Sequence, residues 1–458
     1  MKSVFIIFIL SAACAFCSFF IKNKKPTDPV YIEASQQRTG DAEAGYIYLT
    51  EGDYLKSGIP IGLFKMGFGK SGNDLGREGI NKNIPYSFNA VIAPNGEKIV
   101  SPNCLQCHAQ EFNGKIVIGM GNSLSDYTSN RTSTAKLLER FLKAGPGKEK
   151  KYEAAENFIR SVEAVSPYLV TETKGVNIAD RLAALLAAHR DPKSFKWSDS
   201  LLLSIPEEII PTDVPAWWLL KKKHAMFYNG FGRGDFGRFL MASNLLTVTD
   251  TSEAAEVDSH INDVLAYIYS LQPPAYPKPI NAKLADKGQL IFEQYCMDCH
   301  GTYGKDCSYP NLLIPEEVIQ TDSLLYSSNY SSPQFVNWFN QSWFTSGDHP
   351  AKLVPFRGYI APPLDGIWAT APYLHNGSVP NLETLLNSKL RPKYWDRNFD
   401  DPQYDVDAPG WKFKTETSAS GKNTYNTTLK GYRNTGHTFG DQLSDDERTA
   451  LIEYLKTL

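Results

Sequence analysis

Apolar positions recur at helical spacing in several separate stretches of the chain, and these stretches predict its helices. They cover residues 135–142, 181–188, 261–271, 284–292 and 451–455. The last of them follows Ser444 and an acidic first turn, the pattern of a helix N-terminus. Residues 40–60 predict a short helix and a turn, and residues 86–92 predict a strand. The pattern therefore predicts a mainly α fold.

Two short cysteine-histidine motifs lie between the predicted helices. Cys296, Cys299 and His300 have CxxCH spacing, which is the attachment pattern of a c-type haem. Each thiol adds to one vinyl group, and the histidine becomes the proximal iron ligand. Structural zinc would require two CxxC pairs much closer in sequence and no trailing histidines.

An earlier copy of the motif consists of Cys104, Cys107 and His108. A thioredoxin-like redox motif would explain one CxxC pair but not two CxxCH motifs. The sequence therefore predicts two covalently attached haem c groups. It leaves calcium open as a further cofactor.

The helices and motifs define an internal order that occurs twice. The first series consists of a helix, a CxxCH motif, long loops and a closing helix. It ends at a proline-rich linker at 273–279. The same order then repeats to the end of the chain. We therefore expect two cytochrome c-type haem domains with long loop insertions, at residues 40–276 and 280–458.

The first 22 residues predict an export signal or a short membrane anchor. Lys2 precedes an apolar run at 4–20, and Cys14 is a candidate lipidation site. Because haem c is attached outside the cytoplasmic membrane, we expect a periplasmic or cell-envelope protein, exported and either free or lipid-anchored. The net charge of −3 excludes a basic field, so nucleic acid is not an expected partner. Cys307 lies outside both motifs, and we expect it to be a free thiol.

Residues 361–368 and 371–379 resemble a signature of the dihaem cytochrome c peroxidase superfamily. That group includes bacterial dihaem peroxidases and dihaem rubber oxygenases. The ending at 434–440 is most similar to the rubber-oxygenase branch, in which a late histidine closes the second haem. The resemblance covers roughly residues 40–458, with specific motifs at 285–301, 361–386 and 431–458.

The sequence departs from the peroxidases at the sixth ligand of the second haem. Those enzymes use a methionine here, but no methionine follows Met297 in this chain. The candidates are therefore His349, His375 and His437. The resemblance favours His437 as the ligand, and His375 is expected to support the site rather than bind iron.

The first haem has no obvious distal ligand. Met120 and His189 are interpreted as packing residues, whereas Trp217, Trp218 and His224 form the most unusual stretch of the intervening region. Paired tryptophans can relay electrons between haems, and His224 can serve as a distal base or ligand. Trp218 and His224 are therefore the candidate catalytic residues, although core packing and a solvated lysine run explain the same stretch.

Two functions remain open on the sequence alone. One is an oxidoreductase, peroxidase-like or oxygenase-like, with a reactive first haem for peroxide or dioxygen and an electron-transfer haem at His300 and His437. The other is a non-enzymatic electron carrier in which both haems are six-coordinate. The expected partner is a small redox protein or a small-molecule oxidant.

Overall fold

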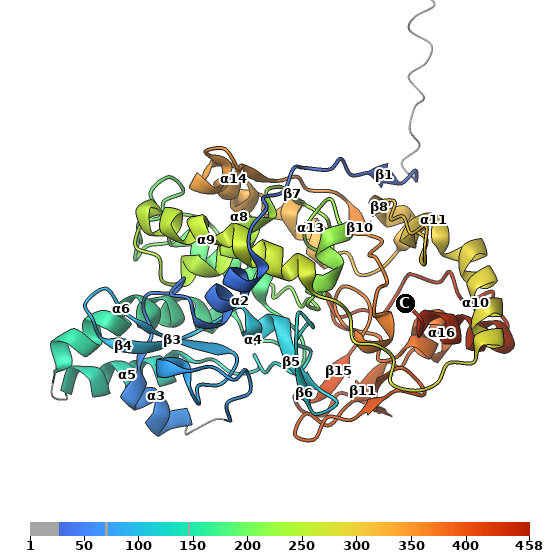
Figure 1. Cartoon of the computed structure of the whole chain (residues 1–458), viewed down its shortest axis with the longest axis horizontal. Coiled ribbons are helices and arrows are strands. Elements are labelled where there is room, and N and C mark those ends of the chain that lie inside the picture. The colour runs from blue at the N-terminus through green and yellow to red at the C-terminus, as the bar shows by residue number, and fades with distance from the viewer. Residues whose placement is uncertain (1–26, 69–71, 145–146) are drawn as a thin grey trace, which may run out of the picture.

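The computed structural model describes residues 27–68, 72–144 and 147–458 (Figure 1). The predicted export or anchor segment lies outside these residues. The described chain is 39% helical and 13% strand, with several small sheets. The prediction of a mainly α fold with two cytochrome c-type haem domains is therefore wrong, and the protein is a mixed α/β fold. No helix within the described ranges is long and apolar enough to cross a membrane.

The helices match most of the predicted stretches. Before the proline-rich linker the structure contains α2 (Ala42–Glu51), α3 (Ile61–Phe68), α4 (Leu105–His108), α5 (Thr132–Ala144), α6 (Lys148–Val165), α7 (Ala179–Ala188), α8 (Phe236–Leu240) and α9 (Thr251–Ser270). After the linker it contains α10 (Ala282–Tyr295), α11 (Met297–His300), α12 (Glu316–Ile319), α13 (Leu324–Ser331), α14 (Gln334–Gln341), α15 (Leu382–Leu386) and α16 (Asp445–Leu455). The helix predictions at 135–142, 181–188, 261–271, 284–292 and 451–455 are confirmed.

The sheets are small, and their pairing is antiparallel. Local hairpins join β3 (Phe88–Ile92) to β4 (Lys98–Pro102), with β2 (Ile59–Pro60) on the outer edge, and β5 (Ala109–Phe112) to β6 (Lys115–Ile118). Near the C-terminus, β11 (Tyr394–Asp396) lies between β14 (Lys414–Thr415) and β15 (Thr424–Asn426), and β12 (Tyr404–Asp405) pairs with β13 (Gly410–Trp411). The strand predicted at 86–92 is β3.

Two further sheets join segments that are distant in sequence. β8 (Leu312–Pro315) lies between β1 (Val30–Tyr31) and β10 (Gly358–Ile360), and β7 (Gly232–Gly234) pairs with β9 (Ala351–Leu353). Trp338 of α14 donates from Nε1 to the carbonyl of Arg190 at 2.7 Å. Part of the chain beyond the linker therefore packs among the earlier helices, as the position of α14 beside α8 and α9 shows (Figure 1).

One helix pair is built in the same way on each side of the linker. α2 packs on α9, and α10 packs on α16. A β-carbon at Gly45 would collide with the backbone of Asp263, and one at Gly288 would collide with the carbonyl of Ala450. Glycine therefore permits the close approach of the helices in both pairs.

Polar caps and prolines set the ends of these helices. Asp250 accepts from the backbone of Ser252 at the start of α9, and α9 ends just before the proline-rich linker. Ser444 and Glu447 form a capping box at the start of α16. These local signals explain why the closing helices could be predicted.

Candidate haem-binding site

The second CxxCH motif lies on a short helical turn that directly follows α10. Cys296 is the C-cap residue of α10, and the amide of His300 donates to the Cys296 carbonyl at 3.0 Å. Cys296, Cys299 and His300 all border one cavity of about 360 Å³. The two thiols and the imidazole therefore face a common, largely apolar space, as covalent haem attachment requires.

A backbone carbonyl fixes the orientation of His300. The Nδ1 atom of His300 lies 2.8 Å from the carbonyl oxygen of Pro362, and burial lowers the pKa of the imidazole. Since the carbonyl can only accept, the proton of the neutral ring sits on Nδ1 and Nε2 keeps its lone pair. A hydrogen bond of this kind holds a metal-binding histidine in place.

His437 lies across the cavity from His300. The centroids of the two imidazole rings are 6.2 Å apart, with an interplanar angle of 62°. A metal held between two imidazole nitrogens, with bonds of about 2.0 Å as for zinc, places the ring centroids roughly 6 Å apart. Burial, with a smaller contribution from His300, lowers the pKa of His437 to about 3, so both rings are neutral and able to bind a metal.

The backbone around His437 is held by a single arginine. Arg391 donates to the carbonyl oxygens of Asn434, Gly436 and His437 at 2.7, 2.6 and 2.9 Å. The amide of His437 donates to the carbonyl of Ile319 at 2.8 Å. These bonds fix the loop that presents the imidazole. No local sequence pattern marks Arg391 for this role.

His375 borders the same cavity, but its Nε2 atom is hydrogen-bonded to Tyr359. The hydroxyl of Tyr359 lies 3.0 Å from this nitrogen and 2.6 Å from the carbonyl of Asp322. The hydroxyl donates its proton to the carbonyl, so it accepts from Nε2–H of His375. His375 therefore offers no free lone pair at Nε2 and supports the site through Tyr359.

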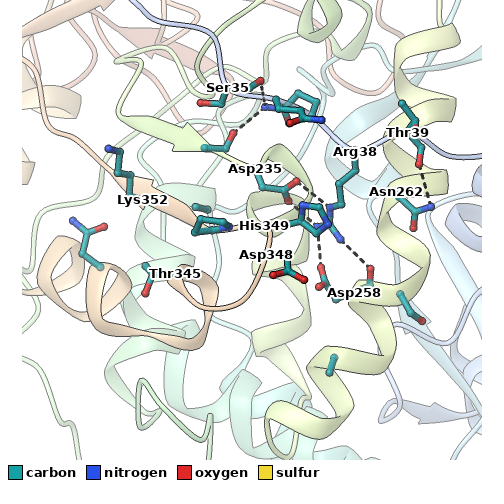
Figure 2. Close-up of a pocket in the computed structure, with 18 residues that line it drawn as sticks. Ser35, Arg38, Thr39, Asp235, Asp258, Asn262, Thr345, Asp348, His349 and Lys352 are labelled. Atoms are coloured by element: carbon teal, nitrogen blue, oxygen red, sulfur yellow. Dashed lines mark hydrogen bonds and ion pairs between the residues drawn. The ribbon is translucent and has the colours of Figure 1, made fainter.

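His349 lies away from this cavity, on the rim of a larger polar groove (Figure 2). The groove has a volume of about 1230 Å³ and lies between residues 35–39, α9 and the 345–352 loop. Arg38 crosses it and pairs with Asp235 at 2.7 Å and Asp258 at 2.8 Å. The groove ties the early chain to α8 and α9 and lies apart from both CxxCH motifs. Of the three candidate histidines, only His437 faces His300.

The first motif is packed more tightly. The ring of His108 stacks on Trp217, with centroids 4.3 Å apart and an interplanar angle of 16°. The Cys107 thiol accepts from Nδ2 of Asn177 at 3.2 Å, and the enclosed space beside Cys104 is only about 20 Å³. The donor set suits haem c, but a porphyrin would require the side chains beside Cys104 to move.

The two tryptophans predicted as a relay connect to different motifs. Trp217 stacks on His108, whereas Nε1 of the adjacent Trp218 donates to the carbonyl of Asp365 at 2.9 Å. Asp365 borders the cavity of the second motif, and Pro362, which orients His300, lies three residues earlier. The tryptophan pair therefore spans the region between the two CxxCH motifs.

The other predicted residues do not join either motif. The Nδ1 atom of His224 lies 2.8 Å from the carbonyl oxygen of Ile32, and the ring packs edge-on against Tyr31. Among the described residues, no contact places His224 beside His108 as a distal base, because the His224 ring faces the early chain instead. Met120 accepts from Gln110 in a buried cluster, His189 stacks on Trp197, and Cys307 is exposed.

The sequence also leaves room for calcium as a further cofactor. Across residues 27–68, 72–144 and 147–458, no three His, Cys, Asp or Glu side chains are grouped to hold a metal ion.

Part of this site belongs to a segment that matches a known protein family. Residues 358–396 match the family described as RoxA-like, cytochrome c-like. The matched segment includes Pro362, His375 and Arg391, which orient or border the second site. This match supports a haem-binding cytochrome c of the RoxA-like branch, with covalently bound haem c.

Two relatives from Sinorhizobium fredii are similar to longer parts of the chain. The uncharacterized protein y4iM is 27% identical over 294 residues, which cover 55% of this chain and 66% of that protein. The uncharacterized protein y4iJ is 43% identical over 253 residues, which cover 41% of each chain. The chain therefore spans just under two thirds and about two fifths of the lengths of these relatives.

Proposed function

We propose that this protein is an exported dihaem c-type cytochrome in which the two haem sites have different roles. The second site, with His300 and His437, serves electron transfer. The first site, at His108, reacts with a small oxidant, either peroxide or dioxygen. The observation that carries the proposal is the facing pair of His300 and His437, for which the first motif has no counterpart in the part of the chain that the structure describes.

His300 and His437 would hold the iron of a haem attached to Cys296 and Cys299. Haem c bound there supplies one-electron redox chemistry through its iron. Two neutral imidazoles favour a six-coordinate, low-spin site with no position for an external ligand. The apolar lining excludes water, and Arg391 keeps His437 in place when the charge of the site changes.

At the first motif no second histidine among the described residues lies against the His108 ring, which stacks on Trp217. Within the described chain, the ring contacts of His189, His224 and His260 are with Trp197, Tyr31 and Tyr48. We therefore infer that a haem attached to Cys104 and Cys107 would lack a strong distal ligand. This contrast supports a reactive first site, and the tight packing beside Cys104 implies that attachment there moves side chains.

Trp217 and Trp218 supply the connection that this division of roles requires. The indole of Trp217 is in van der Waals contact with the proximal imidazole of the first site, and Trp218 contacts the loop that orients His300. Adjacent indoles give a short path through aromatic side chains. We assign the pair to electron transfer and give no catalytic role to His224.

Location and partners follow from the same proposal. The predicted N-terminal export or anchor segment and covalent haem attachment together favour a periplasmic or cell-envelope protein. A small redox protein or a small-molecule oxidant would exchange electrons with it.

The test is a resting-state EPR spectrum of the mature protein, combined with intact mass. We expect a mass increase of two haems, one low-spin signal from the second site and one high-spin signal from the first. Cyanide or carbon monoxide should bind at only one haem. Two low-spin signals, with no external ligand bound at either haem, would show that the protein is an electron carrier and not an enzyme. A mass increase of only one haem would overturn the dihaem proposal.

A further inference from the structure

A buried lysine that has no charged partner among the described residues borders the cavity of the second CxxCH motif. Lys223 is only 8% exposed, and it lines the same space as Cys296, Cys299 and His300. Within residues 27–68, 72–144 and 147–458, no carboxylate lies within ion-pair distance of its ammonium group, and that group makes no hydrogen bond. Burying an unpaired charge is costly, so the position calls for an anion inside the cavity.

The neighbouring lysines show that this burial is specific. Lys221 is exposed and reaches the carbonyl of Leu271 at 3.2 Å. Lys222 pairs with Asp365 at 2.7 Å. Lys223 alone of the three turns inward, so the run is not a uniformly solvated lysine surface.

Asn311 fixes the backbone on both sides of Lys223. Its Nδ2 donates to the carbonyl of Lys222 at 3.1 Å, and its Oδ1 accepts from the amide of His224 at 2.7 Å. The amide of Lys223 itself donates to the carbonyl of Leu220 at 3.1 Å. The inward direction of the side chain is therefore built into the backbone rather than chosen by a flexible loop.

The other ionisable groups of the cavity do not neutralise Lys223. The Asp213 carboxyl, which also borders the cavity, accepts from the hydroxyl of Tyr228 at 2.7 Å, and burial raises its pKa to about 7. Asp365 pairs with Lys222, and Asp298 lies at the exposed end of the motif. The cavity therefore contains a cation whose counter-ion must come from its occupant.

We propose that Lys223 binds a propionate of the haem attached to Cys296 and Cys299. This inference rests on the proposed function, which places a haem in this cavity. A haem propionate is a carboxylate at the edge of a flat apolar group, so it combines the charge that Lys223 lacks with the shape that the apolar lining accepts. Lys223 is then a positioning residue that also sets the charge around the second haem.

The experiment compares Lys223→Met with Lys221→Met in protein matured with haem. Mass spectrometry of the peptide with Cys296 and Cys299 first establishes attachment in the wild type. The midpoint potential of the low-spin haem and its propionate bending band in resonance Raman spectra are then measured. We expect Lys223→Met to lower the potential and shift the band, because the propionate loses its cation, whereas Lys221→Met leaves both unchanged. Lys223→Arg should restore the potential toward the wild-type value.

Unchanged potential and band in haem-loaded Lys223→Met would overturn the proposal and leave the proposed function intact. A wild-type peptide without haem would overturn both. If Lys223→Met does not mature, a crystal structure of the wild-type protein decides. A Lys223 Nζ within hydrogen-bond distance of a propionate oxygen supports the proposal, and any other placement of that nitrogen overturns it.

Discussion

Replacing Arg391 with methionine should loosen the loop that presents His437. The guanidinium donates to five backbone carbonyls, those of Asn434, Gly436 and His437 in the loop and of Thr384 and Leu385 in α15. Methionine keeps much of the side-chain length but donates no hydrogen bond. The substitution therefore removes the link between α15 and the loop without removing the ligand itself.

The size of the effect follows from these bonds. A hydrogen bond from a charged group contributes about 1.5–3 kcal/mol, but water reaches the partly exposed Arg391 and the contributions do not add. We expect a loss of about 3 kcal/mol in the free energy of unfolding, a large share of the roughly 5–15 kcal/mol that stabilises a typical protein. The low-spin fraction of the second haem should also fall, since His437 is no longer held over the iron.

Urea denaturation followed by circular dichroism measures the first effect, and EPR measures the second. Arg433→Met is the matched control, because Arg433 lies in the same loop with an exposed side chain. A free energy of unfolding for Arg391→Met within about 0.5 kcal/mol of the control, the range of ordinary surface substitutions, together with a full low-spin signal, would refute the reasoning.

Three further predictions follow from other contacts. Tyr359→Phe should lower the free energy of unfolding by about 1–3 kcal/mol, because His375 and the Asp322 carbonyl lose their hydrogen-bond partner. The variant should keep the low-spin signal of the second haem. Loss of that signal would indicate that His375 is a ligand. Burial lowers the pKa of His375 to about 3 from 6.5, so the unfolded chain takes up this proton first, and the contribution of His375 to stability should fall by about 1.4 kcal/mol per pH unit between pH 6.5 and 3. Urea denaturation across this range should give a smaller slope for His375→Gln, and an equal slope would contradict the assignment. Gly288→Ala should lower the free energy of unfolding by about 1–3 kcal/mol, because the added β-carbon collides with the Ala450 carbonyl. Gly62→Ala, which has open space around it, is the control and should be neutral or stabilising in thermal unfolding. Equal melting temperatures for the two variants would contradict the close packing of α10 on α16.

The sequence predicted those parts of the fold that depend on local signals. Helical spacing and the Ser444 cap located α16, and the proline-rich linker marked the end of α9. Apart from β3, the strands were missed, because every described strand is two to five residues long and several pair with distant segments, as β7 does with β9. Strands this short show no alternating pattern, and their partners are chosen by tertiary packing.

The site shows the same division. The CxxCH spacing predicts the cysteines that attach haem, and the absence of a methionine after Met297 favours His437 as a ligand. The contacts of Arg391 and the inward turn of Lys223 could not be predicted, because they depend on backbone positions distant in sequence. The lysine run at 221–223 carries no sign of which member is buried.

The most direct test of the account is the EPR spectrum of haem-loaded His437→Ala beside His349→Ala. His349 is an exposed histidine on the groove away from the second motif, so its loss should leave the spectrum unchanged. Loss of His437 should convert the low-spin signal of the second haem to a high-spin signal that responds to added cyanide. A low-spin signal that persists in His437→Ala would contradict the pairing of His300 with His437 and, with it, the proposed division between the two haem sites.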